Sequence, residues 1–222
     1  MAKQAAQAKR IAIFLPNMAG GGAERVVLAS ARDLVARGHR VDLVLISAGG
    51  ELLSLVPPEV RVIDLKQDRF RSALFPLARY LRAVRPDALH AVMWPSTVIA
   101  ILAHRLARSK ARLMVSDQVA LSGQVTAPLQ RAILKATTRL LYPLADVRVV
   151  CSAAAADDLA HLSGFARDRF EVITNPTEPP AAIATNPRVE ALWGEGRPRI
   201  ITIGSLKDQK NHALLLRAFS RL

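Results

Sequence analysis

Short apolar runs alternate along most of the chain with longer segments in which apolar residues recur every three or four positions. The short runs are typical of buried strands and the longer segments of helices packed on one face. The predicted strands are 11–15, 40–46, 60–65, 88–93, 111–116, 146–151 and 170–173. Helices are predicted after Gly22, from Pro76, over 96–108 and 128–142, and between Ser152 and Gly164. Repeated strand–helix units predict an α/β fold with a doubly wound parallel sheet.

The pattern changes after Ile173. Residues 174–198 hold prolines at 176, 179, 180, 187 and 198, which indicates an interdomain linker. A further apolar strand is predicted over 199–204 and a helix over 211–222. One strand and one helix cannot bury both faces of a sheet, so we expect a second Rossmann-like domain to begin here and to be incomplete at Leu222. The expected division is a flexible tail (1–9), an amino-terminal domain (10–173), a linker (174–198) and the start of a second domain (199–222).

Three consecutive glycines, Gly20, Gly21 and Gly22, lie between the first predicted strand and the first predicted helix. This order exposes backbone N–H groups and the positive end of a helix dipole at one edge of the sheet, an arrangement that binds phosphate and other anions. The alternative is that the glycines only form a tight turn. A dinucleotide fingerprint is disfavoured because the glycines are contiguous and the second strand closes on Ser47. A Walker loop is disfavoured because no Gly-Lys-Ser/Thr follows.

The charge balance favours an anionic partner. The formal net charge is +13 and the sequence pI is about 11.1, so nucleic acid, anionic lipid or phosphorylated ligands are the candidates. Nucleic acid is disfavoured because no recognised binding motif is present and aromatic residues are 5% of the chain. The single Cys151 indicates a reducing compartment. No apolar stretch is long enough for a signal sequence or a membrane span, so a cytoplasmic protein is expected, peripheral at the inner face of the cell membrane.

Five segments together resemble the family 4 (group 1) glycosyltransferases of GT-B fold, of the bacterial polysaccharide and lipopolysaccharide type. They are GGGAERVVLASARDLVARGHRVDLV, VMWPSTVIAILA, LMVSDQ, VITNPTEPP and IITIGSLKDQKNHALLLRAFSRL, in that order. The resemblance implies two Rossmann-like domains and retaining transfer of a sugar from a nucleotide-diphosphate donor, expected to be UDP-linked. It also implies a lipid-linked or polysaccharide acceptor on the amino-terminal domain, and neither metal nor other cofactor.

Some family residues carry over and others do not. Gly20, Gly21 and Gly22 match the family's glycine loop, and Lys210 matches the lysine that contacts the donor diphosphate. Ser205 replaces the usual arginine. The subgroup's Glu-Arg pair is Asp117-Gln118 here. The family's paired glutamates lie further on than this chain extends, so the chain alone is expected to have little or no transferase activity.

Ligands of open parallel sheets collect beyond the carboxyl ends of the strands. On that rule Asp117 is the candidate catalytic acid or base, with a loop-capping role as the alternative. Trp94 is a candidate for stacking on a sugar or for core packing, and Glu24 for acceptor contact or helix capping. The candidate substrate-binding residues are Gly20, Gly21, Gly22, Glu24, Arg25, Trp94, Gln118, Asn175, Ser205 and Lys210. No cluster has metal-ligand spacing, so no metal site is predicted.

Two predicted helices carry cationic faces that include an aromatic residue. One face holds Arg71, Arg79, Arg82, Arg85 and Phe75, and the other holds Arg131, Lys135, Arg139 and Tyr142. Such faces suit an anionic membrane surface, and a solvated basic face is the alternative.

Three functions are therefore considered. The leading hypothesis is a glycosyltransferase. The second is a non-catalytic protein that binds the acceptor and pairs with a partner chain. A nucleotide-dependent oxidoreductase is third and is disfavoured by the glycine loop.

Overall fold

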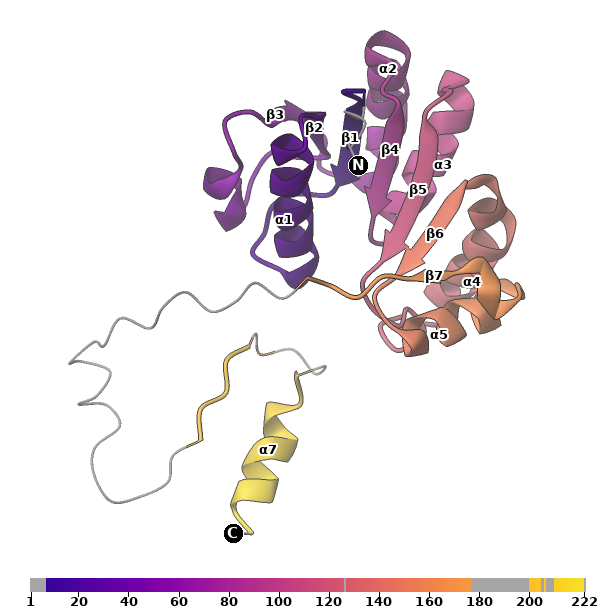
Figure 1. Cartoon of the computed structure of the whole chain (residues 1–222). Coiled ribbons are helices and arrows are strands. Elements are labelled where there is room, and N and C mark those ends of the chain that lie inside the picture. The colour runs from indigo at the N-terminus through magenta and orange to yellow at the C-terminus, as the bar shows by residue number, and fades with distance from the viewer. Residues whose placement is uncertain (1–6, 126, 177–199, 205, 207–209, 222) are drawn as a thin grey trace, which may run out of the picture. The chain divides into compact units, whose positions relative to one another are not determined.

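The computed structural model describes residues 7–125, 127–176, 200–204, 206 and 210–221 (Figure 1). The chain divides into two compact units, Met1–Thr177 and Glu178–Leu222. They are called the first and the second unit below.

The first unit is built on one seven-stranded sheet in the order β3-β2-β1-β4-β5-β6-β7, in which every neighbouring pair is parallel. The strands are β1 Arg10–Leu15, β2 Arg40–Leu45, β3 Arg61–Asp64, β4 Ala88–Val92, β5 Arg112–Asp117, β6 Val147–Val150 and β7 Glu171–Val172. The strand order reverses direction between β1 and β4. This confirms the predicted doubly wound parallel fold, and it places the topological switch point between β1 and β4.

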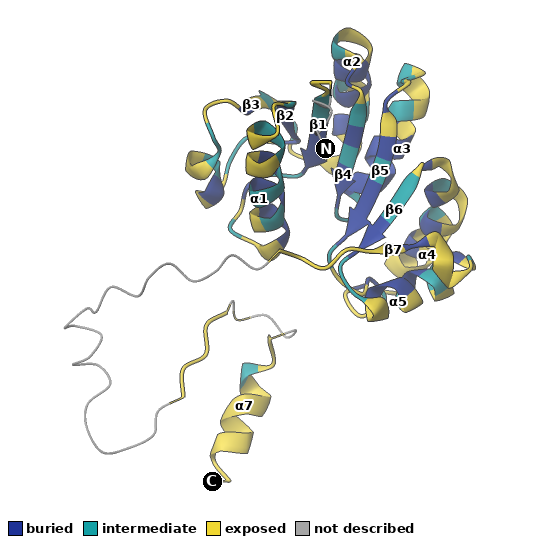
Figure 2. Ribbon diagram, viewed as in Figure 1, coloured by how far each residue is buried: buried dark blue, intermediate teal, exposed yellow. Residues whose placement is uncertain are grey.

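Helices cover both faces of the sheet. The helices of the first unit are α1 Gly22–Ala36, α2 Leu74–Val84, α3 Ser96–Ala107, α4 Pro128–Leu141 and α5 Ala153–Ser163, with 3₁₀ turns η1 Glu51–Leu55, η2 Phe70–Ala73, η3 Tyr142–Leu144 and η4 Arg167–Arg169. Helix α1 packs on the face that carries Ile13 and Leu15. Helices α2 to α5 pack on the opposite face, which carries Phe14 (Figures 1 and 2). Right-handed crossovers running in opposite directions from β1 require this split.

Several predicted helix ends are confirmed. Gly38 has φ 82° and its N–H donates to the Val35 carbonyl after α1, at 2.8 Å. The Ser152 hydroxyl accepts from the Ala155 N–H at the start of α5. The predicted start of α2 is wrong by two residues, because the helix begins at Leu74 and Pro76 lies within its first turn. Proline is tolerated there because first-turn N–H groups have no helical partner.

The predicted strand at 199–204 is not found, since residues 200–204 form no strand and Arg199 lies outside the described residues. A strand needs a neighbour to pair with, and no strand occurs in the described part of the second unit. A helix is present as predicted: α7 covers His212–Phe219, with the Asn211 side chain accepting from the Leu214 N–H. Leu222, the tail up to residue 6 and most of the predicted linker lie outside the described residues.

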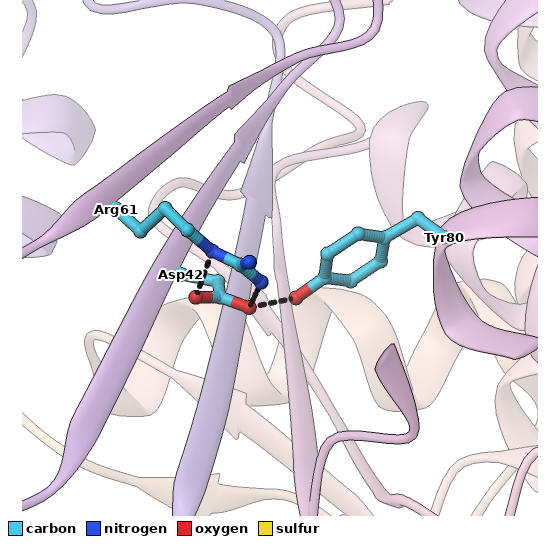
Figure 3. A network of polar contacts seen from close by, with 3 residues as sticks. All are labelled: Asp42, Arg61 and Tyr80. Carbon is cyan, nitrogen blue, oxygen red and sulfur yellow. Dashed lines mark hydrogen bonds and ion pairs between the residues drawn. The ribbon is translucent and has the colours of Figure 1, made fainter. Parts of the chain in front are cut away.

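A buried carboxylate joins three elements of the first unit. Asp42 of β2 accepts two hydrogen bonds from Arg61 of β3, at 2.9 and 2.6 Å, and one from the Tyr80 hydroxyl of α2, at 2.6 Å. Figure 3 shows Arg61 and Tyr80 converging on Asp42. Burial raises the pKa of Tyr80, and the hydrogen bond to Asp42 raises it further. This network attaches α2 to the β2–β3 edge of the sheet.

We expect Tyr80→Phe to lower the free energy of unfolding by about 1–2 kcal/mol, because Asp42 loses one of its buried donors while Arg61 remains. Urea denaturation measures the change. Ser54→Ala, which removes an exposed hydroxyl, is the control and should stay within about 0.5 kcal/mol of the wild type. Equal stabilities for the two variants would contradict a structural role for the Tyr80 hydroxyl.

Candidate functional site

The candidate site is the carboxyl edge of the sheet beside the switch point. The β1–α1 loop there is held by the loop that follows β2. The Met18 N–H donates to the Gly49 carbonyl at 2.8 Å, and the Met18 carbonyl accepts from Leu52 at 3.0 Å and from Gly20 at 3.1 Å. The glycine loop is therefore a fixed structure supported by a second loop.

The three predicted glycines lie at the start of α1. Gly20 has φ 55°, a conformation that favours glycine. Gly21 is the N-cap residue and offers no side-chain cap, so the first-turn N–H groups point to the edge without a capping side chain. The buried Glu24 folds back over Gly21, because a Cβ on Gly21 would overlap the Glu24 carboxylate. An anion at this helix start would therefore meet Glu24, with the exposed Arg25 nearby in sequence as the compensating cation.

The sequence analysis did not identify Gly50. Its φ is 108° and its ψ is 160°. A Cβ at this position would overlap the Met18 carbonyl group and lie 2.5 Å from the Ala19 nitrogen. The sequence feature that could have revealed this contact is the pair Gly49-Gly50 in the loop that follows the second strand.

Trp94 lies in the β4–α3 connection. Its backbone N–H donates to Asp117 Oδ1 at 2.9 Å and its indole Nε1–H donates to Thr137 Oγ1 at 3.2 Å. The side chain is partly buried against the core shared by α2 to α5. Trp94 thus contributes to packing, while its role in stacking on a sugar stays a prediction.

Asp117 is fully buried at the end of β5 and bonded on both oxygens. Besides Trp94, the Tyr142 hydroxyl donates to Asp117 Oδ2 at 2.7 Å, and Thr97 Oγ1 lies 3.0 Å from that hydroxyl. Burial raises the pKa of Asp117 to about 6, against the lowering effect of the bonds from Tyr142 and Trp94. These contacts resemble the loop-capping alternative, and the catalytic assignment stays a prediction.

Tyr142 was wrongly predicted to share the cationic face of α4. It is 1% exposed. Helix α4 ends at Leu141, and Tyr142 begins the turn η3, so its ring faces inward toward Asp117 and Thr97.

The remaining candidates are Gln118, Asn175, Lys210 and Ser205. Gln118 follows β5, and its buried Oε1 has no hydrogen-bond partner within the described residues. Asn175 is exposed after β7. Lys210 belongs to the second unit, is exposed and passes close to Gly204, with its Cγ 3.5 Å from the position of a Cβ there. Ser205 lies outside the described residues.

A pocket of about 290 Å³ opens at the carboxyl ends of β1 to β3. Its walls include Asn17, Ser47, Asp68 and the partly exposed Phe70. Asp68 and Phe70 are not among the predicted site residues, although they follow a predicted strand and the strand-end rule applies to them as well. The pocket offers polar atoms and one aromatic ring, which suits a sugar or another polar ligand.

Among the described residues, no group of three or more His, Cys, Asp or Glu side chains could hold a metal ion. None of the described helices is both long enough and apolar enough to span a bilayer.

The parallel sheet with a glycine loop at its switch point defines a Rossmann-like domain. Residues 20–179 match Glycosyltransferase Family 4. This match covers more than half of the sequence, so the chain belongs to glycosyltransferase family 4.

One relative is the N-acetylgalactosamine-N,N'-diacetylbacillosaminyl-diphospho-undecaprenol 4-alpha-N-acetylgalactosaminyltransferase of Campylobacter jejuni. It is 25% identical over 228 residues, which is 96% of this chain and 60% of the relative. The chain therefore spans 60% of the length of that relative.

Solved structures share the fold. Anabaena HepE in complex with UDP and glucose has a TM-score of 0.55 and 16% identity, covering 77% of this chain and 45% of its own. A glycosyltransferase from Rickettsia africae has a TM-score of 0.59 and 16% identity, covering 76% of this chain and 43% of its own. The predicted GT-B-type Rossmann-like domain is confirmed.

Proposed function

We propose that the protein acts in sugar transfer from a UDP-linked donor to a lipid-linked or polysaccharide acceptor, with retention of the anomeric configuration. The observation that carries the proposal is the family match over residues 20–179, which includes the three glycines at the start of α1 and spans the loops at the carboxyl ends of β4, β5 and β6. In the reaction, the bond between the anomeric carbon and the donor diphosphate breaks, and a bond to an acceptor hydroxyl oxygen forms.

The acceptor is proposed to bind at the carboxyl edge of the first unit. The start of α1 presents first-turn N–H groups that suit a diphosphate, with Arg25 as the cation that offsets the Glu24 carboxylate beside Gly21. The pocket beside it, with Asn17, Ser47 and Phe70, suits a sugar. The Campylobacter relative is named for a diphospho-undecaprenol acceptor, which supports the lipid-linked choice. Lys210 is proposed to neutralise the charge that develops on the leaving donor phosphate.

The affinity for an acceptor tests this proposal. It is measured for two variants that each lose one positive charge from α1 or its end. The probe is N-acetylgalactosamine linked through a diphosphate to a short prenol, titrated by calorimetry. Arg25→Gln should weaken binding about tenfold, because a charge-assisted contact to the diphosphate is lost. Arg37→Gln, an exposed cation beyond the opposite end of α1 that pairs with Asp33, should change the affinity less than twofold.

The same protein is incubated with UDP-sugars in the presence and absence of this acceptor. Release of UDP that depends on the acceptor would support sugar transfer. Saturable acceptor binding that needs Arg25, without release of UDP, would support the second function considered, a non-catalytic acceptor-binding protein. Absence of both would contradict the proposal.

We also propose that α4 docks on an anionic bilayer. Its outer side carries Leu129 (73% exposed), Leu140 (69%) and Ile133 (45%) (Figure 2). The exposed cations Arg131, Lys135 and Arg139 lie on the same helix, which contains no acidic residue. A helix that carries exposed apolar side chains on one face and cations on another matches the interface of a bilayer that contains anionic lipid.

Flotation with vesicles of phosphatidylcholine and phosphatidylglycerol measures this docking. Leu129→Gln with Leu140→Gln should lower vesicle binding at least tenfold, because two inserted leucines are lost. The control replaces two similarly exposed apolar residues away from α4, Leu55 and Ile173 (50% and 56% exposed), by glutamine and should leave binding within twofold. If both pairs of substitutions act equally, or if the wild type does not bind, the membrane proposal is wrong.

A further inference from the structure

A pocket of about 720 Å³ lies at the amino edge of the sheet, opposite the candidate site. Its lining residues stand at the carboxyl-terminal ends of α2 and α3 and at the starts of β4 and β5. Strand β4 has five residues, so the two edges are on the order of 15 Å apart. This pocket is therefore separate from the site proposed for the acceptor.

The charges that line the pocket are mostly positive. Arg82, Arg85, Arg108 and Lys110 line it, and Asp87 is the one acidic residue that lines it in the described part of the chain. The Asp87 carboxylate is partly engaged, since Oδ2 accepts from the Arg10 backbone N–H at 2.7 Å. The pocket thus has an excess of cations that its own carboxylate does not balance.

Among the described residues, Arg82 is the one cation of these four whose side chain forms a hydrogen bond. Arg82 donates to the Leu106 carbonyl at the end of α3, at 2.6 Å. Within the described part of the chain, the side chains of Arg85, Arg108 and Lys110 form no hydrogen bond or ion pair. Cations near helix ends interact favourably with the helix dipole. This applies to Arg82 and also to Arg85 and Arg108, which end α2 and α3. The exposed side chains of Arg85, Arg108 and Lys110 are nevertheless open to a ligand.

The backbone holds two of these cations at the mouth of the pocket. Arg85 ends α2 with φ 48° and ψ 61°, and Arg108 ends α3 with φ 50° and ψ 41°. Helices commonly end in this left-handed conformation with glycine, which has no side chain to clash. Here both positions carry arginine, so each helix end places a guanidinium group beside the same cavity.

From this arrangement we infer a second anion site that binds a diphosphate or a comparable phosphate group at Arg85, Arg108 and Lys110. Each guanidinium group can donate two parallel hydrogen bonds to two oxygens of one phosphate group, and the lysine ammonium adds a positive point charge. The inference goes beyond the proposed sugar transfer and does not depend on it.

The test uses the whole chain in a buffer free of phosphate and sulfate, with sodium pyrophosphate titrated by calorimetry at low salt. Saturable binding is expected for the wild type. Arg85→Gln with Arg108→Gln should weaken it at least tenfold. The control is Arg79→Gln with Arg105→Gln, which removes two exposed cations from the same helices outside the pocket and should change the affinity less than twofold. Lys110→Gln alone should weaken binding at least threefold, and it tests the site if the double variant does not fold.

Absence of saturable pyrophosphate binding, or an equal loss in the control, would overturn the inference. If pyrophosphate does bind, vesicles that contain phosphatidic acid show whether the natural ligand is a lipid headgroup or a free phosphate compound. If a lipid headgroup occupies the pocket, the Arg85 and Arg108 substitutions lower vesicle binding together with pyrophosphate binding. If the ligand is a free phosphate compound, vesicle binding is unchanged while pyrophosphate binding falls.

Discussion

Replacing Gly50 by alanine is expected to lower the free energy of unfolding by about 3 kcal/mol, and to disorder the glycine loop at the candidate site. Gly50 has φ 108° and ψ 160°, a region that is almost restricted to glycine and costs other residues roughly 1–3 kcal/mol. The added Cβ would also overlap the Met18 carbonyl group. Because the obstacle is backbone rather than a flexible side chain, either the β1–α1 loop or the loop after β2 must move.

Gly49→Ala is the matched control for this prediction. A Cβ on Gly49 meets no atom within 4 Å, and Gly49 is not among the glycines with positive φ. This variant should stay within about 0.5 kcal/mol of the wild type. Urea denaturation compares the two variants, and acceptor titration well below the unfolding midpoint reports on the loop. Similar stabilities for the two variants would show that the contact between Gly50 and Met18 does not constrain the loop.

The second large effect concerns pH and two buried groups that act in opposite directions. Burial raises the pKa of Asp117 from 3.8 to about 6. Between these values the folded protein keeps a proton that the unfolded chain has lost, so Asp117 stabilises the fold below pH 4. That contribution, roughly 3 kcal/mol, is lost as the pH rises to 6.

Burial lowers the pKa of His90 from 6.5 to about 4. Here the unfolded chain binds the proton first as the pH falls, so the contribution of His90 is present above pH 6.5 and is lost as the pH falls to 4. Part of the His90 side chain is accessible to solvent. We therefore expect His90 to contribute about 2 kcal/mol to the free energy of unfolding above pH 6.5. In the wild type the two contributions oppose each other between pH 4 and 6.5, which leaves a net loss of about 1 kcal/mol as the pH rises.

Substitution should separate these contributions. In Asp117→Asn, stability should rise with pH between 4 and 6.5 more steeply than in the wild type, by about 3 kcal/mol. In His90→Gln, stability should instead fall over the same interval relative to the wild type, by about 2 kcal/mol. Urea denaturation at intervals of half a pH unit gives the three curves. Parallel curves would contradict the assignment of opposite shifts to Asp117 and His90.

The fold could be predicted because its strongest determinants are local. Strands buried on both faces give continuous apolar runs, and residues such as Gly38 and Ser152 mark helix ends by their own chemistry. The strand predicted at 199–204 failed because an apolar run specifies a strand only when a neighbouring strand is present to pair with it.

The sequence predicted where the candidate site lies, but it did not predict which side chains contact one another there. The strand-end rule selected Trp94 and Asp117. It could not show that Tyr142, far along the chain, donates to Asp117, because no periodicity relates two residues on different elements. The same limit hid the network of Asp42 with Tyr80 and the contact of Gly50 with Met18.

The central claim is that an acceptor binds at the carboxyl edge of the sheet, beside the switch point between β1 and β4. The most direct measurement is amide chemical-shift mapping by NMR while the prenol-diphosphate-linked sugar is titrated into the isotope-labelled protein. The account predicts saturable shifts at Gly20, Gly21, Gly22 and Trp94. Shifts confined to the amino edge, around Arg85 and Arg108, or no saturable shifts, would contradict it.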